Sequence, residues 1–345
     1  MSWGGGIGLP REASLRPLQL SAPRLLLASF AGMIAFGTAG LTLLPGVYIG
    51  APLGLVDALF TITSAVCVTG LSVVDVGTTL APFGQVWLLL MIQAGGLGFV
   101  VIQDLRLRLR GRKRRLSTHS RLTLLVSAWL LVGATALFSI FEAGETLAGL
   151  DIGDRLANAA FMAATPRTAG FNAVDYDEIA DPSLFLTLGL MWIGGSPGST
   201  AGGVKTTTVA LLALLLFARL RGDRAVSTGG RTVPEETLQR AVGLAVGSVI
   251  LLALFVFALL VTELPASAEG DRVRFVRLVF EAQSALGTVG LSMGATAELT
   301  PAGRLLVVAL MFLGRVGPLA VLGAMAIRGQ RRVAMRYAHE DVLVG

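Results

Sequence analysis

Long apolar stretches constrain the fold of this chain more than any other feature of its sequence. Six of them lie at residues 24–47, 83–103, 121–141, 183–217, 240–262 and 303–327. Each reaches the roughly 20 residues that an α-helix needs to cross the hydrocarbon core of a bilayer. Lipid offers the backbone no hydrogen-bond partner, so a chain that crosses it repeatedly must do so as helices. The sequence therefore predicts an all-α integral membrane protein.

The composition and the charge distribution support that prediction. Hydrophobic residues make up 54% of the chain and charged residues only 14%, whereas about a quarter of a soluble domain is charged. Basic clusters at 104–115, 219–231 and 328–336 each follow an apolar stretch. The positive-inside rule explains such clusters without nucleic acid as a partner. We therefore expect a multi-pass protein of the inner (plasma) membrane, in contact with lipid, with both termini cytoplasmic.

Three shorter apolar pieces, Val56–Val66, Asp154–Ala164 and Phe275–Leu286, lie in the connections on the other side. At about 11 residues they are too short to span a bilayer, and their length is typical of re-entrant helices. A glycine-containing stretch follows each one. The sequence thus predicts helices that dip into the membrane and return as extended chain.

These glycine-containing stretches form an internal repeat. TSAVCVTGLSVVD (63–75), TPRTAGFNAVD (165–175) and SALGTVGLSMG (284–294) align on their glycines, and a Leu-Met pair recurs in the apolar stretch after each. The aligned glycines are Gly70, Gly170 and Gly290, and the methionines, each 21 residues later, are Met91, Met191 and Met311. The repeated unit is a helix, a re-entrant helix, a glycine loop and a second helix.

The repeat predicts the organisation of the chain. We expect a cytoplasmic segment (1–23), a first pore unit (24–103), a basic cytoplasmic loop (104–120), a second pore unit (121–218), a cytoplasmic loop (219–239), a last pore unit (240–327) and a cytoplasmic tail (328–345).

The glycine loops have the chemistry of an ion filter. A helix that enters the membrane from outside directs the negative end of its dipole toward the membrane centre. Extended residues after it can present backbone carbonyls, as the TVGYG loop of potassium channels does. The candidate filter residues are Val68, Thr69, Gly70, Thr168, Ala169, Gly170, Thr288, Val289 and Gly290. We expect K⁺ to bind at the backbone of the three glycines.

The fourth apolar stretch is interrupted in its middle by five glycines and a proline. Glycine-interrupted hydrophobic segments indicate transport sites. The candidate gate residues are Gly194, Gly195, Ser196, Pro197, Gly198, Ser199, Thr200, Ala201, Gly202 and Gly203. A phosphate-binding loop fits less well, because Val204 stands where that motif requires its lysine.

Several charged residues are further candidates. Arg315 lies deep in the last apolar stretch, where a buried arginine is a functional candidate, here as a positive barrier in the pore. Lys205, at the end of the interrupted stretch, is a second candidate barrier. Glu281 precedes the third glycine and is expected to pack and orient rather than conduct. The acidic loop 175–181 contains no basic residue, and either it concentrates cations or it is an ordinary solvated loop.

These motifs resemble a known family. GGSPGSTAGGVKTTT, RTAGFN, GTVGLS and MFLGRVGPL are similar to strings in the membrane subunit of the Trk/Ktr potassium-uptake systems. The resemblance implies four units around a pseudo-fourfold axis, usually in a homodimer, with Gly194–Gly203 as an intramembrane gate and Arg315 beneath the filter. It also implies a cytoplasmic ring subunit that binds the regulatory nucleotide. No tightly bound cofactor is implied, only K⁺ as transported ion with Na⁺ or H⁺ coupling.

The chain departs from this family in one respect. Three units are recognisable where the family has four, and the unit without a counterpart is the second. The string Gly95–Phe99, which closes two units in the family, occurs here once. Three loops around a fourfold axis would leave a quarter of the carbonyl cage empty.

Two functions remain open from the sequence. The first is potassium transport through the filter, with or without impairment by the missing unit. The alternative is a non-conducting structural or regulatory relative that associates with a complete transporter. An enzyme is disfavoured, because the sequence has no spaced His/Cys/carboxylate cluster and no nucleophile paired with a base.

Overall fold

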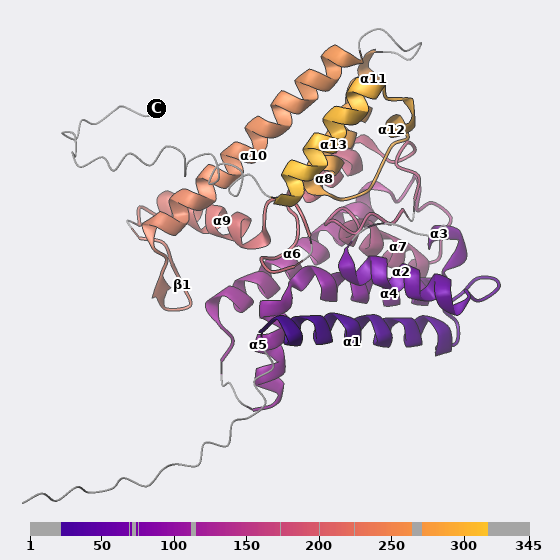
Figure 1. Cartoon of the computed structure of the whole chain (residues 1–345), viewed down its shortest axis with the longest axis horizontal. Helices are drawn as coiled ribbons and strands as arrows, with labels where there is room; N and C mark the ends of the chain where they lie inside the picture. Colours follow the sequence, from indigo (N-terminus) through magenta and orange to yellow (C-terminus); the bar gives the residue numbers. More distant parts are fainter. Residues whose placement is uncertain are drawn as a thin grey trace, which may run out of the picture.

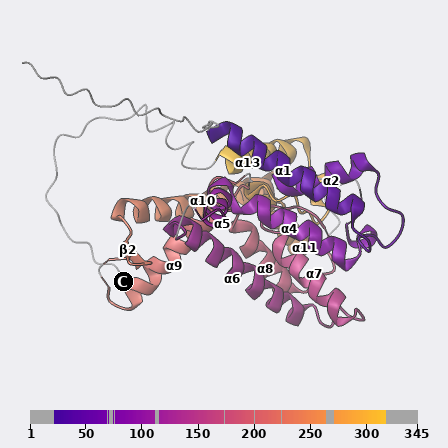
Figure 2. The same ribbon diagram turned by 90° about the horizontal axis from the view of Figure 1, so that it is seen from below.

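A computed structural model describes residues 22–68, 70, 74, 76–111, 115–172, 174–199, 201–223, 225–263 and 271–316. Within these ranges the regular secondary structure is α-helical apart from one short β-hairpin (Figure 1 and Figure 2). The predicted terminal segments 1–23 and 328–345 fall wholly or almost wholly outside the described residues.

The helices follow the predicted repeat. The first unit contains α1 (Ala22–Leu43), α2 (Leu55–Cys67), α3 (Val76–Thr79), α4 (Pro82–Leu97) and α5 (Phe99–Leu109). The second contains α6 (Thr118–Phe141), α7 (Ile152–Ala164), α8 (Asp181–Trp192) and α9 (Thr206–Leu220). The hairpin β1 (Ser227–Thr228) and β2 (Arg231–Thr232) precedes the last unit, which contains α10 (Glu235–Thr262), α11 (Asp271–Gly287), α12 (Ala295–Glu298) and α13 (Pro301–Val316).

The short helices α2, α7 and α11 confirm the three predicted re-entrant pieces, although α11 begins four residues earlier, at Asp271. Among the described residues, α6 and α10 are long and apolar enough to cross a membrane, and a bent pair, α4 with α5, would be a third. The stretch predicted at 83–103 is therefore not one straight span. It bends by 101° at Gly98.

Gly98 permits this bend through its backbone conformation and its missing side chain. Its φ is +79°, and a Cβ there would lie 2.8 Å from the carbonyl oxygen of Pro197. The amide of Phe99 donates to the carbonyl of Gly198 at 3.2 Å. The corner between α4 and α5 is thus occupied by the loop that interrupts the second unit.

Each unit packs against the unit that follows it in the sequence. The inner helix α4 packs against the re-entrant helix α7 of the next unit, and α8 packs against α11 in the same way. Figure 1 shows the helices of the first and last units apart from each other, with helices of the second unit between them. The burial of the repeated methionines differs accordingly. Met91 and Met191 are buried, whereas Met311 on α13 is 43% exposed. Among the described residues, the last inner helix has no re-entrant helix of a following unit packed against it, as the other two have.

In each of the two later units, one buried glutamate connects the end of the outer helix to the start of the inner helix. Glu142 ends α6 and accepts a hydrogen bond from the amide of Ala180, just before α8, at 3.1 Å. Glu263 ends α10 and accepts from the amide and hydroxyl of Thr300, just before α13, at 3.2 and 2.6 Å. A carboxylate thus satisfies the free amides at the start of each inner helix.

The first unit makes the same connection without a carboxylate. The amide of Ala81, just before α4, donates to the backbone carbonyl of Val47 at 2.9 Å. All three units therefore fasten the start of the inner helix to the end of the outer one, and only the acceptor differs.

We expect Glu263→Ala to lower the stability of the folded protein by about 1–3 kcal/mol, because it leaves the Thr300 amide without its buried acceptor. Thermal unfolding of the purified protein in detergent measures this. Glu298→Ala, which removes the same charge from an exposed position of α12, is the matched control. Equal unfolding midpoints for the two variants would contradict the assigned role.

Candidate functional site

The three glycine loops share one unusual backbone conformation. Two residues before each glycine, a non-glycine residue has positive φ: 55° at Val68, 72° at Thr168 and 51° at Thr288. In the part of the chain that the structure describes, no other non-glycine residue does so. The glycines themselves have φ of 81° at Gly70, 71° at Gly170 and 94° at Gly290. Such strain costs about 1–3 kcal/mol per residue and persists where the surrounding structure imposes it, most often at functional sites. The predicted filter residue Thr69 lies outside the described residues.

The amides of these loops turn back toward their re-entrant helices. Ala169 donates to the carbonyl of Thr165 at 3.0 Å, and Val289 to the carbonyl of Ser284 at 2.8 Å. The amide of Gly290 donates to the hydroxyl of Ser284 at 3.2 Å. The amides are thus used on the helix side, whereas the carbonyl oxygen of Val289 lies against the neighbouring glycine loops.

The loops converge on one another. A Cβ at Gly70 would lie 2.8 Å from the Cα of Gly170 and 3.0 Å from the carbonyl oxygen of Val289. A Cβ at Gly170 would lie 2.3 Å from that same oxygen. Backbones from all three units are thus in direct contact, at the carboxyl ends of α2, α7 and α11, and helix dipoles make that region electronegative.

Two side-chain oxygens at this point lack partners. The hydroxyls of Thr168 and Thr288 are buried and form no hydrogen bond within the described structure. They occupy equivalent positions in the second and last loops. Potassium channels bind their cation with oxygen ligands alone. The hydroxyls of Thr168 and Thr288 and the loop carbonyls are oxygen ligands of that kind. Elsewhere among the described residues, no group of His, Cys, Asp or Glu could hold a metal ion.

Backbone hydrogen bonds join the two ends of the loop that interrupts the fourth apolar stretch. Ile193 and Val204 form a parallel bridge. The amide of Gly194 donates to Val204 at 2.9 Å, and the amide of Val204 donates to Trp192 at 3.1 Å. These bonds satisfy the polar groups that the break frees, which a membrane protein requires. Of the ten predicted gate residues, only Thr200 lies outside the described residues.

The loop contacts both of its neighbouring units. The amide of Ser196 donates to the carbonyl of Gly96, in α4, at 3.0 Å. On the other side, a Cβ at Gly202 would lie 2.2 Å from the hydroxyl of Thr288 and 2.7 Å from the carbonyl of Gly287. The predicted gate thus lies directly against the glycine loop of the last unit.

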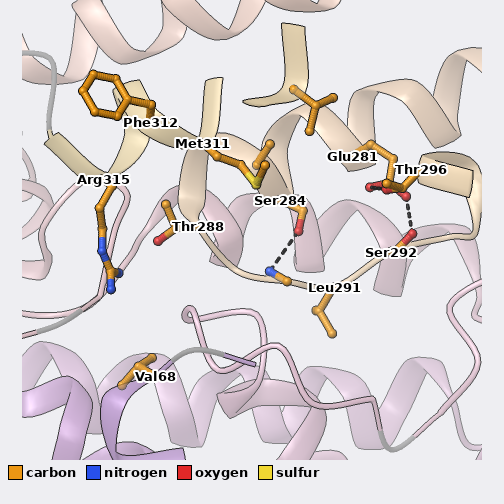
Figure 3. A pocket seen from close by; sticks show the side chains of 13 residues that line it. Val68, Glu281, Ser284, Thr288, Leu291, Ser292, Thr296, Met311, Phe312 and Arg315 are labelled. Atoms are coloured by element: carbon orange, nitrogen blue, oxygen red, sulfur yellow. Dashed lines mark hydrogen bonds between the residues drawn. The ribbon is translucent and has the colours of Figure 1, made fainter. Parts of the chain in front are cut away.

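The two predicted barrier residues carry positive charges that interact with each other. Lys205 precedes α9, and its ammonium group donates to the carbonyl of Ala201 in the same loop. The charge of Arg315 is close enough to act on Lys205 electrostatically. The side chain of Arg315 is exposed on α13, and in Figure 3 it points away from α13 toward the ribbon that carries Val68. Its depth in the membrane and its role as a barrier in the pore stay predictions.

A cavity of about 490 Å³ occupies this place between α13 and the first unit (Figure 3). It is lined by Val68, Glu281, Ser284, Ala285, Thr288, Gly290, Leu291, Ser292, Thr296, Val307, Met311, Phe312 and Arg315. The space beside the glycine loops is therefore open on the side where α13 lacks cover.

Glu281 has the orienting role that the sequence predicts. Its buried carboxylate accepts hydrogen bonds from the hydroxyls of Ser292 and, at 2.7 Å, Thr296. It thus fixes the chain that leaves the last glycine loop.

The acidic loop 175–181 is partly neutralised by a residue from another unit. Asp177 pairs with Arg277 of α11 at 3.3 Å. The two residues are 100 positions apart, so the local sequence does not reveal the pair.

The sequence analysis did not single out Arg167, which precedes the second glycine loop. Its guanidinium is buried and donates to the hydroxyl of Ser127 in α6 at 3.3 Å, while Nε and Nη1 have no hydrogen-bond partner within the described structure. The available signal was its place in the RTAGFN string, immediately before Thr168.

Comparison with known proteins identifies the family. Residues 2–120 and 115–332 match the TrkH family, described as cation transport proteins. The chain belongs to this family. It is 37% identical to the potassium/sodium uptake protein NtpJ of Enterococcus hirae, over 85% of this chain and 64% of that protein. It is 36% identical to the Ktr system potassium uptake protein B of Bacillus subtilis, over 73% of this chain and 54% of the relative.

The fold also matches a solved structure. The potassium transporter TrkH from Vibrio parahaemolyticus superposes with a TM-score of 0.68 at 17% identity, over 88% of this chain and 63% of that one. The chain thus has the fold of this transporter and spans between half and two thirds of the length of these three proteins.

We expect Gly202→Ala to destabilise the protein by about 1–3 kcal/mol, because its Cβ would overlap the Thr288 hydroxyl and overpacking costs that much. Thermal unfolding in detergent provides the measurement. Gly189→Ala in α8 is the control, since a Cβ there meets nothing within 4 Å. If Gly202→Ala unfolds at the control temperature, the loop does not press against the last glycine loop.

Proposed function

We propose that this chain is a membrane subunit for potassium uptake and that the ion passes along the three glycine loops. The observation that carries the proposal is the shared left-handed backbone of the loops, which meet at the carboxyl ends of three re-entrant helices. The names of the relatives support potassium, or potassium and sodium, as the ion.

The proposed chemistry is replacement of the ion's water shell by oxygen. Carbonyls of residues 68–70, 168–170 and 288–290, with the hydroxyls of Thr168 and Thr288, are the candidate ligands. The negative ends of the helix dipoles of α2, α7 and α11 favour a cation there and disfavour an anion. No bound cofactor is needed for this step, and coupling to Na⁺ or H⁺ is compatible with it.

The loop 194–203 is the proposed gate. It lies against Thr288 and is held at its neck by backbone hydrogen bonds between Trp192, Gly194 and Val204. Lys205 and Arg315 add positive charge near the same path, and this charge opposes passage of a cation while the loop is in place. Displacement of the loop away from Thr288 would open the path.

The proposed partners follow from the relatives. Three of them are named as proteins of Ktr potassium uptake systems, which supports a system of more than one component. We propose a homodimer of the membrane subunit regulated by a cytoplasmic ring that binds the nucleotide itself. The basic segments, including 104–111 and 219–223, would then face the cytoplasm.

The cavity beside α13 favours a second candidate function. The three glycine loops contact one another. The cavity beside them is lined by Met311 and Arg315 of α13. A chain of this shape would act as a non-conducting relative that associates with a complete transporter, or it would conduct only when another subunit covers α13.

Expression in a bacterial strain that lacks potassium uptake separates these functions. We expect growth on low potassium to be restored and then lost with Gly170→Asp, because a Cβ at Gly170 would lie 2.3 Å from the carbonyl oxygen of Val289. Gly222→Asp is the control, because Gly222 is exposed with open space around it and aspartate tolerates its positive φ. Membrane expression without rescue would favour the second function.

A deletion tests the gate. Removal of residues 197–201 leaves the paired neck intact but removes the part of the loop that occupies the α4–α5 corner. In proteoliposomes we expect the flux of K⁺ or Na⁺ to rise severalfold over that of the intact chain. Unchanged flux in a chain shown to conduct would contradict the gate assignment.

A further inference from the structure

A second cavity lies far from the glycine loops, on the face that carries the basic segments. It has a volume of about 520 Å³ and is formed by the end of α5, the start of α6 and the β1–β2 hairpin. Figure 1 shows these three elements gathered on one side of the molecule. Four arginines line it: Arg108, Arg115, Arg121 and Arg231.

The positive charge of this cavity is not compensated by the protein. No acidic residue lines it, and within the described structure no ion pair or side-chain hydrogen bond involves these four guanidinium groups. Four like charges around one cavity repel one another. A bound anion with more than one negative charge would relieve that repulsion.

The cavity has a fixed frame. Buried Asp104 of α5 accepts hydrogen bonds from the amide of Ser117 at 3.2 Å and from the hydroxyl of Ser120 at 2.7 Å. These bonds hold α5 to the start of α6 and use the nearby carboxylate. The hairpin closes the third side, where a Cβ at Gly229 would lie 3.8 Å from the guanidinium of Arg121.

One wall of the cavity is apolar and continues onto the outer surface of α6. Leu122 and Leu125 line the cavity. Leu125 is 50% exposed, and Trp129, one turn further along the same face, is 73% exposed. The charged cavity therefore opens onto an apolar strip of a helix that is long enough to cross the membrane.

We propose that this cavity binds a membrane phospholipid, with the headgroup phosphates on the arginines and an acyl chain along Leu125 and Trp129. Guanidinium groups bind phosphate oxygens through paired, charge-assisted hydrogen bonds. Four of them suit a headgroup with two phosphates better than one with a single phosphate. The positive-inside rule alone accounts for basic residues near the membrane surface but not for a framed cavity built from three separate segments.

The proposal is independent of ion conduction, so binding itself is the readout. The full chain is purified in detergent, stripped of lipid and titrated with cardiolipin (two phosphates), phosphatidylglycerol (one) and phosphatidylcholine (zwitterionic), with bound lipid counted by native mass spectrometry. We expect cardiolipin to bind most tightly. The double variant Arg121→Gln/Arg231→Gln should weaken cardiolipin binding about tenfold, since it removes two charge-assisted contacts.

The matched control is Arg110→Gln/Arg221→Gln, which removes the same charge from exposed residues of the same face that do not line the cavity. It should leave cardiolipin binding unchanged. Equal weakening in the two double variants would overturn the proposal in favour of general attraction to basic residues. Equal unfolding midpoints without lipid verify that both variants are folded.

Two further arms separate the source of the phosphate. Inorganic pyrophosphate, added at the lipid concentration, should not displace cardiolipin, and displacement would assign the cavity to a soluble ligand instead. Cardiolipin with brominated acyl chains should quench a fluorescence component that Trp129→Phe removes. Quenching that is identical in wild type and Trp129→Phe would overturn the placement of the acyl chain.

Discussion

The structure depends on the contact between backbones of the three glycine loops. Gly70 and Gly170 approach so closely that neither could carry a Cβ, and the carbonyl of Val289 closes the same contact. This approach requires strained backbone at Val68 and its counterparts, which the re-entrant helices impose by accepting the loop amides. The strain, the helix dipoles and the unpartnered threonine hydroxyls all come together there, and this combination favours a cation site.

Each unit reaches that contact through the same internal connection. The start of the inner helix is fastened to the end of the outer helix, by Glu142 and Glu263 in the later units and by the carbonyl of Val47 in the first. Neighbouring units then pack inner helix to re-entrant helix. Since α13 has no such neighbour among the described residues, the open cavity and the exposure of Met311 and Arg315 have one common cause.

The loop at 194–203 links the units rather than merely interrupting a helix. It donates to Gly96 of the first unit and lies against Thr288 of the last. The bend at Gly98 accommodates this loop, since a side chain at Gly98 would overlap the carbonyl oxygen of Pro197. A displacement of this loop would therefore change contacts in two units at once.

By itself the sequence determined the membrane class, the repeat, the re-entrant helices and the positions of the glycine loops. Each of these depends on local apolar length or on a fixed spacing such as the 21 residues from Gly170 to Met191. Only the tertiary structure decided that 83–103 bends, that Arg315 faces an open cavity and that Asp177 is paired with Arg277. These depend on contacts between residues far apart in the chain, and no local sequence pattern records such contacts.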